Sequence, residues 1–353
     1  MTLFIQFMQY SLSFPTGEVN YIFSNATEAM ATLADKDKCV LITDANLAAL
    51  YSSFFKEYKT IVLPAGETNK TLETVKIVAE QLLEYEAHRN TLLVGIGGGV
   101  VTDITGFIAS IYMRGISFGY VPTSLLGMAD AAIGGKNGVN LGLHKNILGT
   151  IQQPKFILYD VAFLETLPHE EWSNGFAEII KYACLFDEDL YRKLHQHTID
   201  FYKQNGQALE QLIAKCADWK NKTVLADEKE QSSRKLLNFG HTAGHAIETL
   251  HNLPHGHAVA LGMIVACIVS EKVCGLNKEV KEDLIELLEQ YDLPTQFSIN
   301  PERIMEILVM DKKRNRDNID FIVLTKIGEA AIKTLSFDII QQALVSFAHA
   351  SNN

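Results

Sequence analysis

The first half of the chain alternates short apolar runs with amphipathic segments. The apolar runs, rich in branched residues, are residues 38–44, 59–65 and 91–99. The segments that follow them have apolar residues at helical spacing and are residues 45–58, 73–87 and 101–113. Apolar strands that alternate with helices are typical of a parallel sheet with helices on both faces. The pattern therefore predicts an α/β fold class, with an N-terminal Rossmann-like domain.

The second half of the chain has a different pattern, dominated by helical periodicity. The expected helices are residues 170–186, 187–198, 205–230 and 278–294. A single late strand is expected at residues 318–328, after a polar loop. We place the boundary at Leu167-Pro168, so residues 1–167 form the α/β domain and residues 168–353 a mainly α-helical domain.

The N-terminal residues 1–14 are apolar and uncharged. A signal peptide would have a basic start and a small-residue cleavage site, and this stretch has neither. Glutamines interrupt it, and it is too short to span a bilayer. We expect an edge strand of the first domain and no membrane attachment.

Charge and cysteine content narrow the class of protein. The net charge is −11, which disfavours a general nucleic-acid binder but allows an anionic small substrate held by a few local cations. The five cysteines are scattered and form no CxxC pair. This indicates a reducing compartment, and we expect a cytoplasmic protein.

A glycine-rich turn joins the third predicted strand to its helix. Gly97, Gly98 and Gly99 allow close approach of the backbone to a phosphate, and the helix N-terminus supplies N–H groups. This suits the pyrophosphate of a dinucleotide, although the spacing is not GxGxxG and a simple tight turn is the alternative. Asp44 and Asn46 end an earlier strand, where Asp44 could contact a ribose or cap a helix.

The segment 114–149 is rich in glycine and poor in charge. Arg114, Asp130, Lys136 and Lys145 stand out in it. Sparse lysines beside glycines are what a phosphate or carboxylate pocket needs. The alternative is a solvated hairpin.

Five of the eleven histidines lie close together, at positions 241, 245, 251, 255 and 257. Catalytic zinc commonly takes two histidines and a glutamate. If residues 234–245 are helical, Arg234, Asn238, His241 and His245 lie on one face. His241 and His245 could both bind metal, or His245 could move protons.

The remaining ligands of such a metal come from elsewhere in the chain. Glu178 and Lys181 share a helix face, so Glu178 is a candidate carboxylate ligand. The residues alone do not choose between His255 and His257 as the further histidine.

In combination these motifs are specific. The chain contains PAGETNKT, GGGVVTD, YMRG, VPTSLLGMADAAIGGKNGVN, KNILG, GFAEIIKYA, LNFGHTAGHAIE, HGHAVALGM and DKK between Asp44 and Lys313. It resembles the 3-dehydroquinate synthase family of the sugar-phosphate cyclase superfamily.

The resemblance implies conversion of 3-deoxy-D-arabino-heptulosonate 7-phosphate to 3-dehydroquinate and phosphate, in the shikimate route to aromatic amino acids. Members of the family use NAD and a divalent metal, zinc or cobalt. NAD oxidises a substrate hydroxyl, phosphate is eliminated, the ketone is reduced again, the ring opens and an intramolecular aldol step closes the carbocycle. We expect the active site in the cleft between the two domains.

The resemblance also assigns residues. The metal ligands would be Glu178, His241 and His255. His245 would contact the phosphate and help move protons, and Arg114 would come from the neighbouring subunit of a homodimer. Arg234 and Lys220 would hold the substrate carboxylate and hydroxyl groups. The phosphate contacts would be Lys136, Asn146, Asn238 and Lys312, and the polar wall of the site would be completed by Asp130, Lys145 and Lys181. The NAD contacts would be Asp44, Asn46, Glu67, Lys70, Gly98, Gly99, Val100, Asp103, Thr123, Ser124, Lys136, Lys145 and Thr166.

Two other enzyme classes share parts of this pattern. A sister cyclase acting on a neutral sugar phosphate would not need Arg234 and Lys220, which suit a carboxylate. A metal-dependent polyol dehydrogenase would release NADH and has no evident use for the lysines of IGGKNG and DKK. His257 stands where many family members have glutamate, so it is either a partner of a metal ligand or a competitor for the metal.

Overall fold

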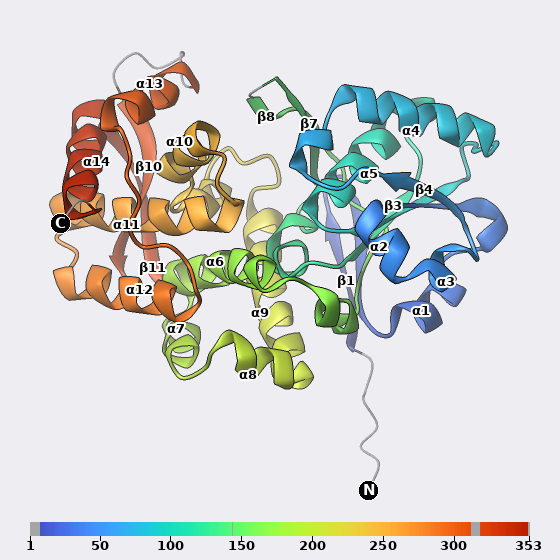
Figure 1. The fold of residues 1–353 in the computed structure, drawn as a ribbon, viewed down its shortest axis with the longest axis horizontal. Coiled ribbons are helices and arrows are strands. Elements are labelled where there is room, and N and C mark those ends of the chain that lie inside the picture. Colours follow the sequence, from blue (N-terminus) through green and yellow to red (C-terminus); the bar gives the residue numbers. More distant parts are fainter. Residues whose placement is uncertain (1–7, 143, 312–317, 352–353) are drawn as a thin grey trace, which may run out of the picture. The chain divides into compact units, whose positions relative to one another are not determined.

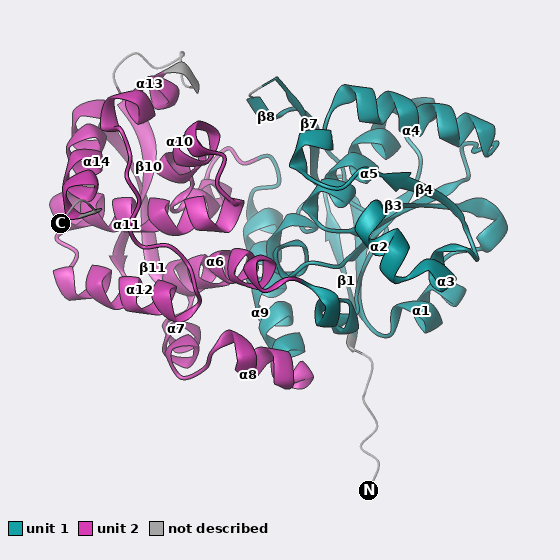
Figure 2. Cartoon of the chain, in the orientation of Figure 1, with its two compact units in different colours: residues 1–167, 209–229 teal, residues 168–208, 230–353 magenta. Residues whose placement is uncertain are grey.

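The computed structural model describes residues 8–142, 144–311 and 318–351. Lys312, one of the predicted phosphate contacts, lies outside these described residues. The chain forms two compact units (Figures 1 and 2). Unit 1 comprises residues 1–167 and 209–229, and unit 2 comprises residues 168–208 and 230–353.

Unit 1 is built on a seven-stranded sheet with the order β1-β2-β9-β6-β5-β3-β4. Its strands are β1 (Met8–Phe14), β2 (Gly17–Phe23), β3 (Cys39–Asp44), β4 (Lys59–Leu63), β5 (Leu92–Gly97), β6 (Phe118–Pro122) and β9 (Phe156–Tyr159). All neighbouring pairs are parallel except β1 with β2. The parallel sheet is confirmed, and the N-terminal strand lies at its edge.

Helices cover this sheet. They are α1 (Ala26–Leu33), α2 (Ala45–Leu50), α3 (Ser52–Phe55), α4 (Leu72–Glu84) and α5 (Gly99–Ile111). A core of buried side chains, including Met30 of α1, Leu47 of α2 and Phe55 of α3, packs against Leu41 and Val94 of the sheet. The single helix expected at residues 45–58 is wrong, because the chain leaves helical geometry at position 51 between α2 and α3.

The glycine-rich segment contains a hairpin of β7 (Lys136–Leu141) and β8 (His144–Ile151). Most of β8 is exposed, so this part takes the form of the solvated hairpin considered as an alternative. The base of the hairpin is anchored by the buried amide of Asn137, which donates to the carbonyls of Gly135 at 2.9 Å and Gln152 at 3.1 Å. A π-helical turn at Gly127–Ala131 precedes it and was not predicted.

Residues 209–229 of unit 1 lie mostly on helix α9 (Gly206–Ala226), although the sequence prediction assigned them to the second domain. Two contacts show why this stretch belongs with the sheet. Tyr21 Oη of β2 donates to Asn221 Oδ1 at 2.6 Å, and Lys220 contacts Asp130.

Unit 2 is mainly helical, as predicted. Its helices are α6 (His169–Phe186), α7 (Glu188–His195), α8 (Ile199–Gln204), α10 (His241–His251), α11 (His255–Cys274), α12 (Lys278–Gln290), α13 (Pro301–Asp311) and α14 (Phe337–Ser351). The late strand β10 (Asn318–Lys326) pairs with β11 (Glu329–Ser336), which was not predicted. By length and composition α11 is apolar enough to cross a membrane, but 67% of that stretch is buried, which is the pattern of a core helix.

Helices α10 and α11 approach each other unusually closely. A Cβ atom on Gly262 would lie only 1.9 Å from the carbonyl oxygen of Gly240. Gly240 has φ +77°, which ends the preceding 3₁₀ helix Ser233–Asn238 and starts α10 at His241. The single helix over residues 234–245 is therefore wrong, and only His241 and His245 share a helix face there.

Candidate functional site

Three side chains of unit 2 form a candidate metal centre. Glu178 lies within α6, His241 is the first residue of α10, and His255 is the first residue of α11. Glu178 Oε1 lies 3.4 Å from His241 Nε2 and 3.2 Å from His255 Nε2. One ligand atom from each residue lies within 4.8 Å of the others. We call these three residues the metal cluster.

The second nitrogen of each imidazole faces an acceptor. His241 Nδ1 lies 3.1 Å from the carbonyl oxygen of Phe239, and His255 Nδ1 lies 3.6 Å from Glu248 Oε1. An acceptor at Nδ1 holds a proton on that nitrogen, which leaves Nε2 as the nitrogen that can bind a metal ion. The cluster thus offers two imidazole nitrogens and a carboxylate, a donor set that fits zinc or a similar divalent ion.

The pKa values of the three residues in the metal cluster are set by burial and by neighbouring charged groups. Burial alone would raise the pKa of Glu178, but the attraction of Lys181, His241 and His255 holds it well below its usual value. Burial, together with Lys181, lowers the pKa of His241 well below its usual value. Burial also opposes charge on His255, yet Glu178 and Glu248 raise its pKa to about 9. An ionised Glu178 and a neutral His241 are the forms in which these residues bind metal.

Of the other clustered histidines, His245 lies beside the metal cluster, whereas His251 and His257 are not part of it. The ring of His245 is exposed, with its centroid 5.0 Å from that of His241 and 6.0 Å from that of His255, so it stands beside the metal cluster. Among the described residues, His257 belongs to neither group of side chains close enough to share a metal ion. His251 packs its ring against Phe297 at 4.9 Å.

Arg234 and Asn238 lie on the 3₁₀ helix before α10. The Arg234 side chain is buried, with 1% of its surface exposed. Asn238 Nδ2 donates to Glu230 Oε1 at 2.9 Å, and Glu230 has φ +56°. Glu230 was not predicted as a site residue, because the sequence analysis placed it at the end of a helix over residues 205–230, whereas the helix ends at Ala226.

In unit 1 the glycine-rich turn leads directly from β5 into α5. Gly98 is the residue before α5 and provides no side-chain cap, so the first N–H groups of the helix have no side-chain acceptor there. A Cβ atom added to Gly98 would lie 3.4 Å from Ser124 Oγ, so the Ser124 side chain is next to the turn. The Thr123 N–H donates a hydrogen bond to the Gly97 carbonyl at 3.0 Å. Thr123, Ser124 and the turn therefore lie together, as the predicted nucleotide contacts require. The half-buried Val100 follows in the first turn of α5.

The remaining predicted NAD contacts of this group lie near the ends of β3 and the short 3₁₀ helices, except Asp103, which lies within α5. Asp44 caps α2 by accepting from the N–H groups of Asn46 at 2.9 Å and Leu47 at 3.1 Å, so the capping role holds. Lys70 and Asp103 form an ion pair with little exposed surface. Glu67 Oε1 accepts from Asn140 Nδ2 at 2.8 Å. Thr166 Oγ1 lies 3.1 Å from Tyr51 Oη.

The predicted substrate-binding cations of unit 1 differ in burial. The Lys220 ammonium contacts Asp130 Oδ1 at 2.9 Å and donates to the Asp130 carbonyl at 2.8 Å, with 7% of the residue exposed. The hairpin residues, Lys136, Lys145 and Asn146, are exposed. Arg114 is also exposed and has φ +70°, directly after Met113 with φ +48°.

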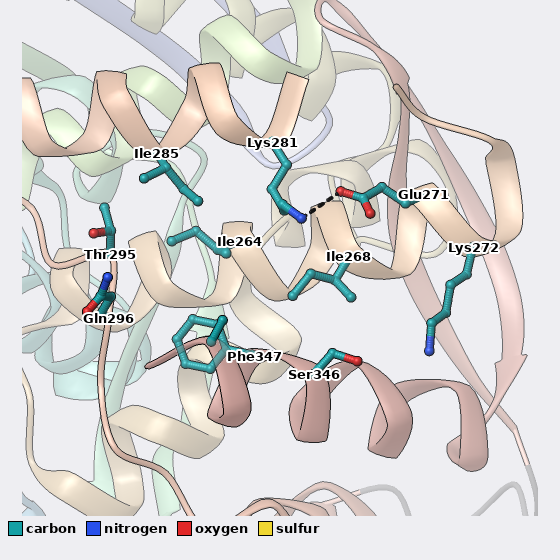
Figure 3. Close-up of a pocket in the computed structure, with 11 residues that line it drawn as sticks. Ile264, Ile268, Glu271, Lys272, Lys281, Ile285, Thr295, Gln296, Ser346 and Phe347 are labelled. Carbon is teal, nitrogen blue, oxygen red and sulfur yellow. Dashed lines mark ion pairs between the residues drawn. The ribbon is translucent and has the colours of Figure 1, made fainter. Parts of the chain in front are cut away.

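A separate cavity of about 280 Å³ lies between α11, α12 and α14 (Figure 3). Its walls include the apolar side chains of Ile264, Ile268 and Phe347. Glu271 and Lys281 also line it and form an ion pair of 3.1 Å (Figure 3). None of the predicted site residues lines this cavity.

The sequence matches two family models over most of its length. Residues 60–174 match the 3-dehydroquinate synthase N-terminal model, and residues 175–314 match the C-terminal model. Curated relatives named 3-dehydroquinate synthase include one from Thermoanaerobacter pseudethanolicus, 37% identical over 91% of this chain and 94% of its own. Another, from Pyrococcus furiosus, is 40% identical over 87% of this chain and 92% of its own.

Solved structures agree with the fold. One is a 2-epi-5-epi-valiolone synthase from Streptomyces hygroscopicus subsp. jinggangensis, solved with NAD+ and Zn2+ bound. It is 28% identical to this chain, and the two superpose with a TM-score of 0.86 over 97% of this chain and 98% of the other. A 2-deoxy-scyllo-inosose synthase at 24% identity has a TM-score of 0.84, over 96% of this chain and 100% of its own, and supports the fold alone. By the extent of its match to both family models and to its curated relatives, the chain belongs to the 3-dehydroquinate synthase family.

Proposed function

We propose that this chain is a lyase that converts 3-deoxy-D-arabino-heptulosonate 7-phosphate to 3-dehydroquinate and inorganic phosphate. The observation that carries the proposal is the metal cluster, found in a chain of the 3-dehydroquinate synthase family. A donor set of two histidines and a glutamate leaves room for substrate oxygens in the remaining coordination positions.

In this proposal Glu178, His241 and His255 hold Zn2+ or Co2+. The ion, when bound, would supply Lewis-acid stabilisation of negative charge on substrate oxygens. Lys181 pairs with Glu178 and adds positive charge to this buried wall. The solved relative with NAD+ and Zn2+ bound supports the same two cofactors here.

The glycine-rich turn and α5 would hold the NAD pyrophosphate in unit 1. NAD, when bound, would supply reversible hydride transfer, so no cofactor is consumed in the net reaction. Gly98, Gly99 and Val100 offer backbone N–H groups at a helix N-terminus, where an anion is stabilised. The side chains proposed to complete the nucleotide site are Asp44, Asn46, Glu67, Lys70, Asp103, Thr123, Ser124, Lys136, Lys145 and Thr166.

Several cations would recognise the acid phosphate substrate. Arg234 and Lys220 would hold its carboxylate and hydroxyl groups, because a buried guanidinium and ammonium favour an anionic partner. The phosphate would contact Lys136, Asn146, Asn238 and Lys312. His245, exposed beside the metal cluster, would accept the proton removed next to the oxidised carbon as the C–O bond to phosphate breaks. Asp130 would position Lys220.

We also propose a cytoplasmic homodimer in which Arg114 serves the site of the neighbouring copy. Arg114 is exposed on a turn with two successive left-handed residues, Met113 and Arg114, so its guanidinium is accessible to a second copy of the chain. None of the five cysteines, all of them among the described residues, forms a disulfide, which supports a reducing compartment.

The second candidate is a sister cyclase with a neutral sugar phosphate substrate, favoured by the likeness to the valiolone synthase. Purified protein, NAD and zinc should be given either the proposed acid phosphate or a neutral seven-carbon ketose 7-phosphate, which has the carbon count of valiolone. Phosphate release from the acid alone, without NADH accumulating at 340 nm, is the expected result. Release from the neutral sugar alone would favour the sister cyclase, and net NADH formation a polyol dehydrogenase.

A further inference from the structure

Glu248 is a buried carboxylate to which the proposed function gives no role. It lies on α10, seven residues after His241, and only 5% of it is exposed. Its Oε1 atom lies 3.6 Å from His255 Nδ1, on the side of the ring opposite the Nε2 atom that faces Glu178. A carboxylate this buried is costly unless a partner compensates it, so its position beside a ligand ring calls for a reason.

We propose that Glu248 is a positioning residue that orients His255 for metal binding. The proposal rests on the metal-dependent function above. A carboxylate facing Nδ1 fixes the proton on that nitrogen, holds the ring plane, and makes Nε2 a stronger donor. Through Glu248, α10 supports the ligand on α11 in addition to supplying its own ligand, His241.

The two histidine ligands differ in this support. His241 Nδ1 faces the neutral carbonyl of Phe239 at 3.1 Å, whereas His255 Nδ1 faces a charged group. His255 is also the more exposed ligand, with 28% of its side chain accessible against 12% for His241. A more exposed ring has fewer packing contacts to hold it, so its orientation depends more on a charged partner.

The same geometry allows one rival explanation. Ligand atoms of His245, Glu248 and His255 lie within 4.8 Å of one another, close enough to share a second cation. In that case Glu248 would itself be a ligand, and its loss would remove one equivalent of bound metal without weakening the first.

The experiment measures zinc affinity in the full chain by competition with a chromogenic chelator, together with the stoichiometry. The variants are Glu248→Ala and the size-preserving Glu248→Gln, whose amide oxygen can occupy the same place opposite Nδ1 but carries no charge. The control is Glu271→Gln on α11, a carboxylate with 15% of its side chain exposed and paired with Lys281. Circular dichroism checks the fold, and the cobalt absorption spectrum reports the ligand geometry.

We expect one zinc per chain in the wild type and about 10–100-fold weaker binding in Glu248→Ala. Glu248→Gln should weaken zinc binding less than Glu248→Ala does, and its cobalt absorption spectrum should shift. Glu271→Gln should have the zinc affinity and the cobalt spectrum of the wild type. Wild-type affinity in both folded Glu248 variants would overturn the role. The role would also be overturned if the wild type bound two zinc ions and the Glu248 variants lost only the more weakly bound one. A wild type that binds no zinc would instead contradict the proposed metal-dependent function itself.

Discussion

In unit 2 the metal cluster lies on tightly packed helices, whereas in unit 1 the predicted phosphate-binding residues lie on the exposed hairpin β7–β8. Glu178 is fully buried, and the Nδ1 atoms of both histidine ligands face acceptors. Lys136 and Asn146 are exposed on strands of a two-stranded sheet. The difference suggests that the metal site is preorganised, while the phosphate contacts rely on charge more than on fixed geometry.

The largest expected effect comes from removing a ligand of the metal cluster. His241→Ala should lower zinc affinity by more than ~100-fold, the upper range for loss of a group that only supports a ligand. Turnover should be abolished, while the circular dichroism spectrum stays close to wild type. His349→Ala on α14, which removes an exposed histidine with no proposed role, is the control. Full activity of His241→Ala without added metal would disprove the ligand assignment.

Next in size is a change that separates the two helices without touching a ligand. Gly262→Ala places a methyl group against the Gly240 carbonyl, so α10 and α11 must move apart. We expect the free energy of unfolding to fall by about 3 kcal/mol, together with zinc affinity. Gly206→Ala, where nothing lies within 4 Å of the added Cβ, is the matched control. Wild-type stability and zinc affinity in Gly262→Ala would show that the close approach does not hold the ligands.

A smaller effect is expected on the hairpin. Lys136→Ala should raise KM for the phosphate substrate about tenfold, since a hydrogen bond to a charged group contributes about 1.5–3 kcal/mol. Zinc affinity should not change. Lys76→Ala, on the exposed face of α4, controls for loss of surface charge. Unchanged KM and kcat would count against a phosphate contact of Lys136. A loss of zinc binding would contradict the view that the metal cluster and the hairpin act separately.

The smallest effect separates two roles of Asp44 in unit 1. Asp44→Ala should destabilise the chain by about 1 kcal/mol through loss of the α2 cap. Asp44→Asn keeps a capping oxygen, so it should restore most of that stability in thermal unfolding. If Asp44 also binds the ribose, both variants should raise the KM for NAD. An unchanged KM for NAD in both would leave capping as its function.

Regular periodicity predicted the central strands of the sheet in unit 1 and several helices, but it gave no expectation for β2, β9, α1, α11, α13 or α14, and it failed where one residue changes the local backbone. The helix expected at residues 234–245 is interrupted because Gly240 adopts φ +77° beneath α11, a tertiary contact invisible to spacing. Strand β11 was missed because its residues alternate weakly and most are only partly buried. Residues 209–229 look like any helix in sequence, and only contacts such as Tyr21 with Asn221 place them in unit 1.

The choice between His255 and His257 shows the same limit at the candidate site. Spacing alone left both open, and only the family motif favoured His255. In the structure both lie at the start of α11, where residues two apart point about 200° from each other around the axis. His255 faces Glu178, so His257 cannot face it as well. The position at which the helix starts decides the ligand, and that boundary is what sequence patterns define least well.

The most direct test of the central claim is phosphate release from 3-deoxy-D-arabino-heptulosonate 7-phosphate with NAD, before and after chelation and then with zinc or cobalt restored. The account predicts that chelation stops release, that either metal restores it, and that no NADH accumulates. Release that continues at full rate in metal-free protein, or no release with any metal, would contradict it.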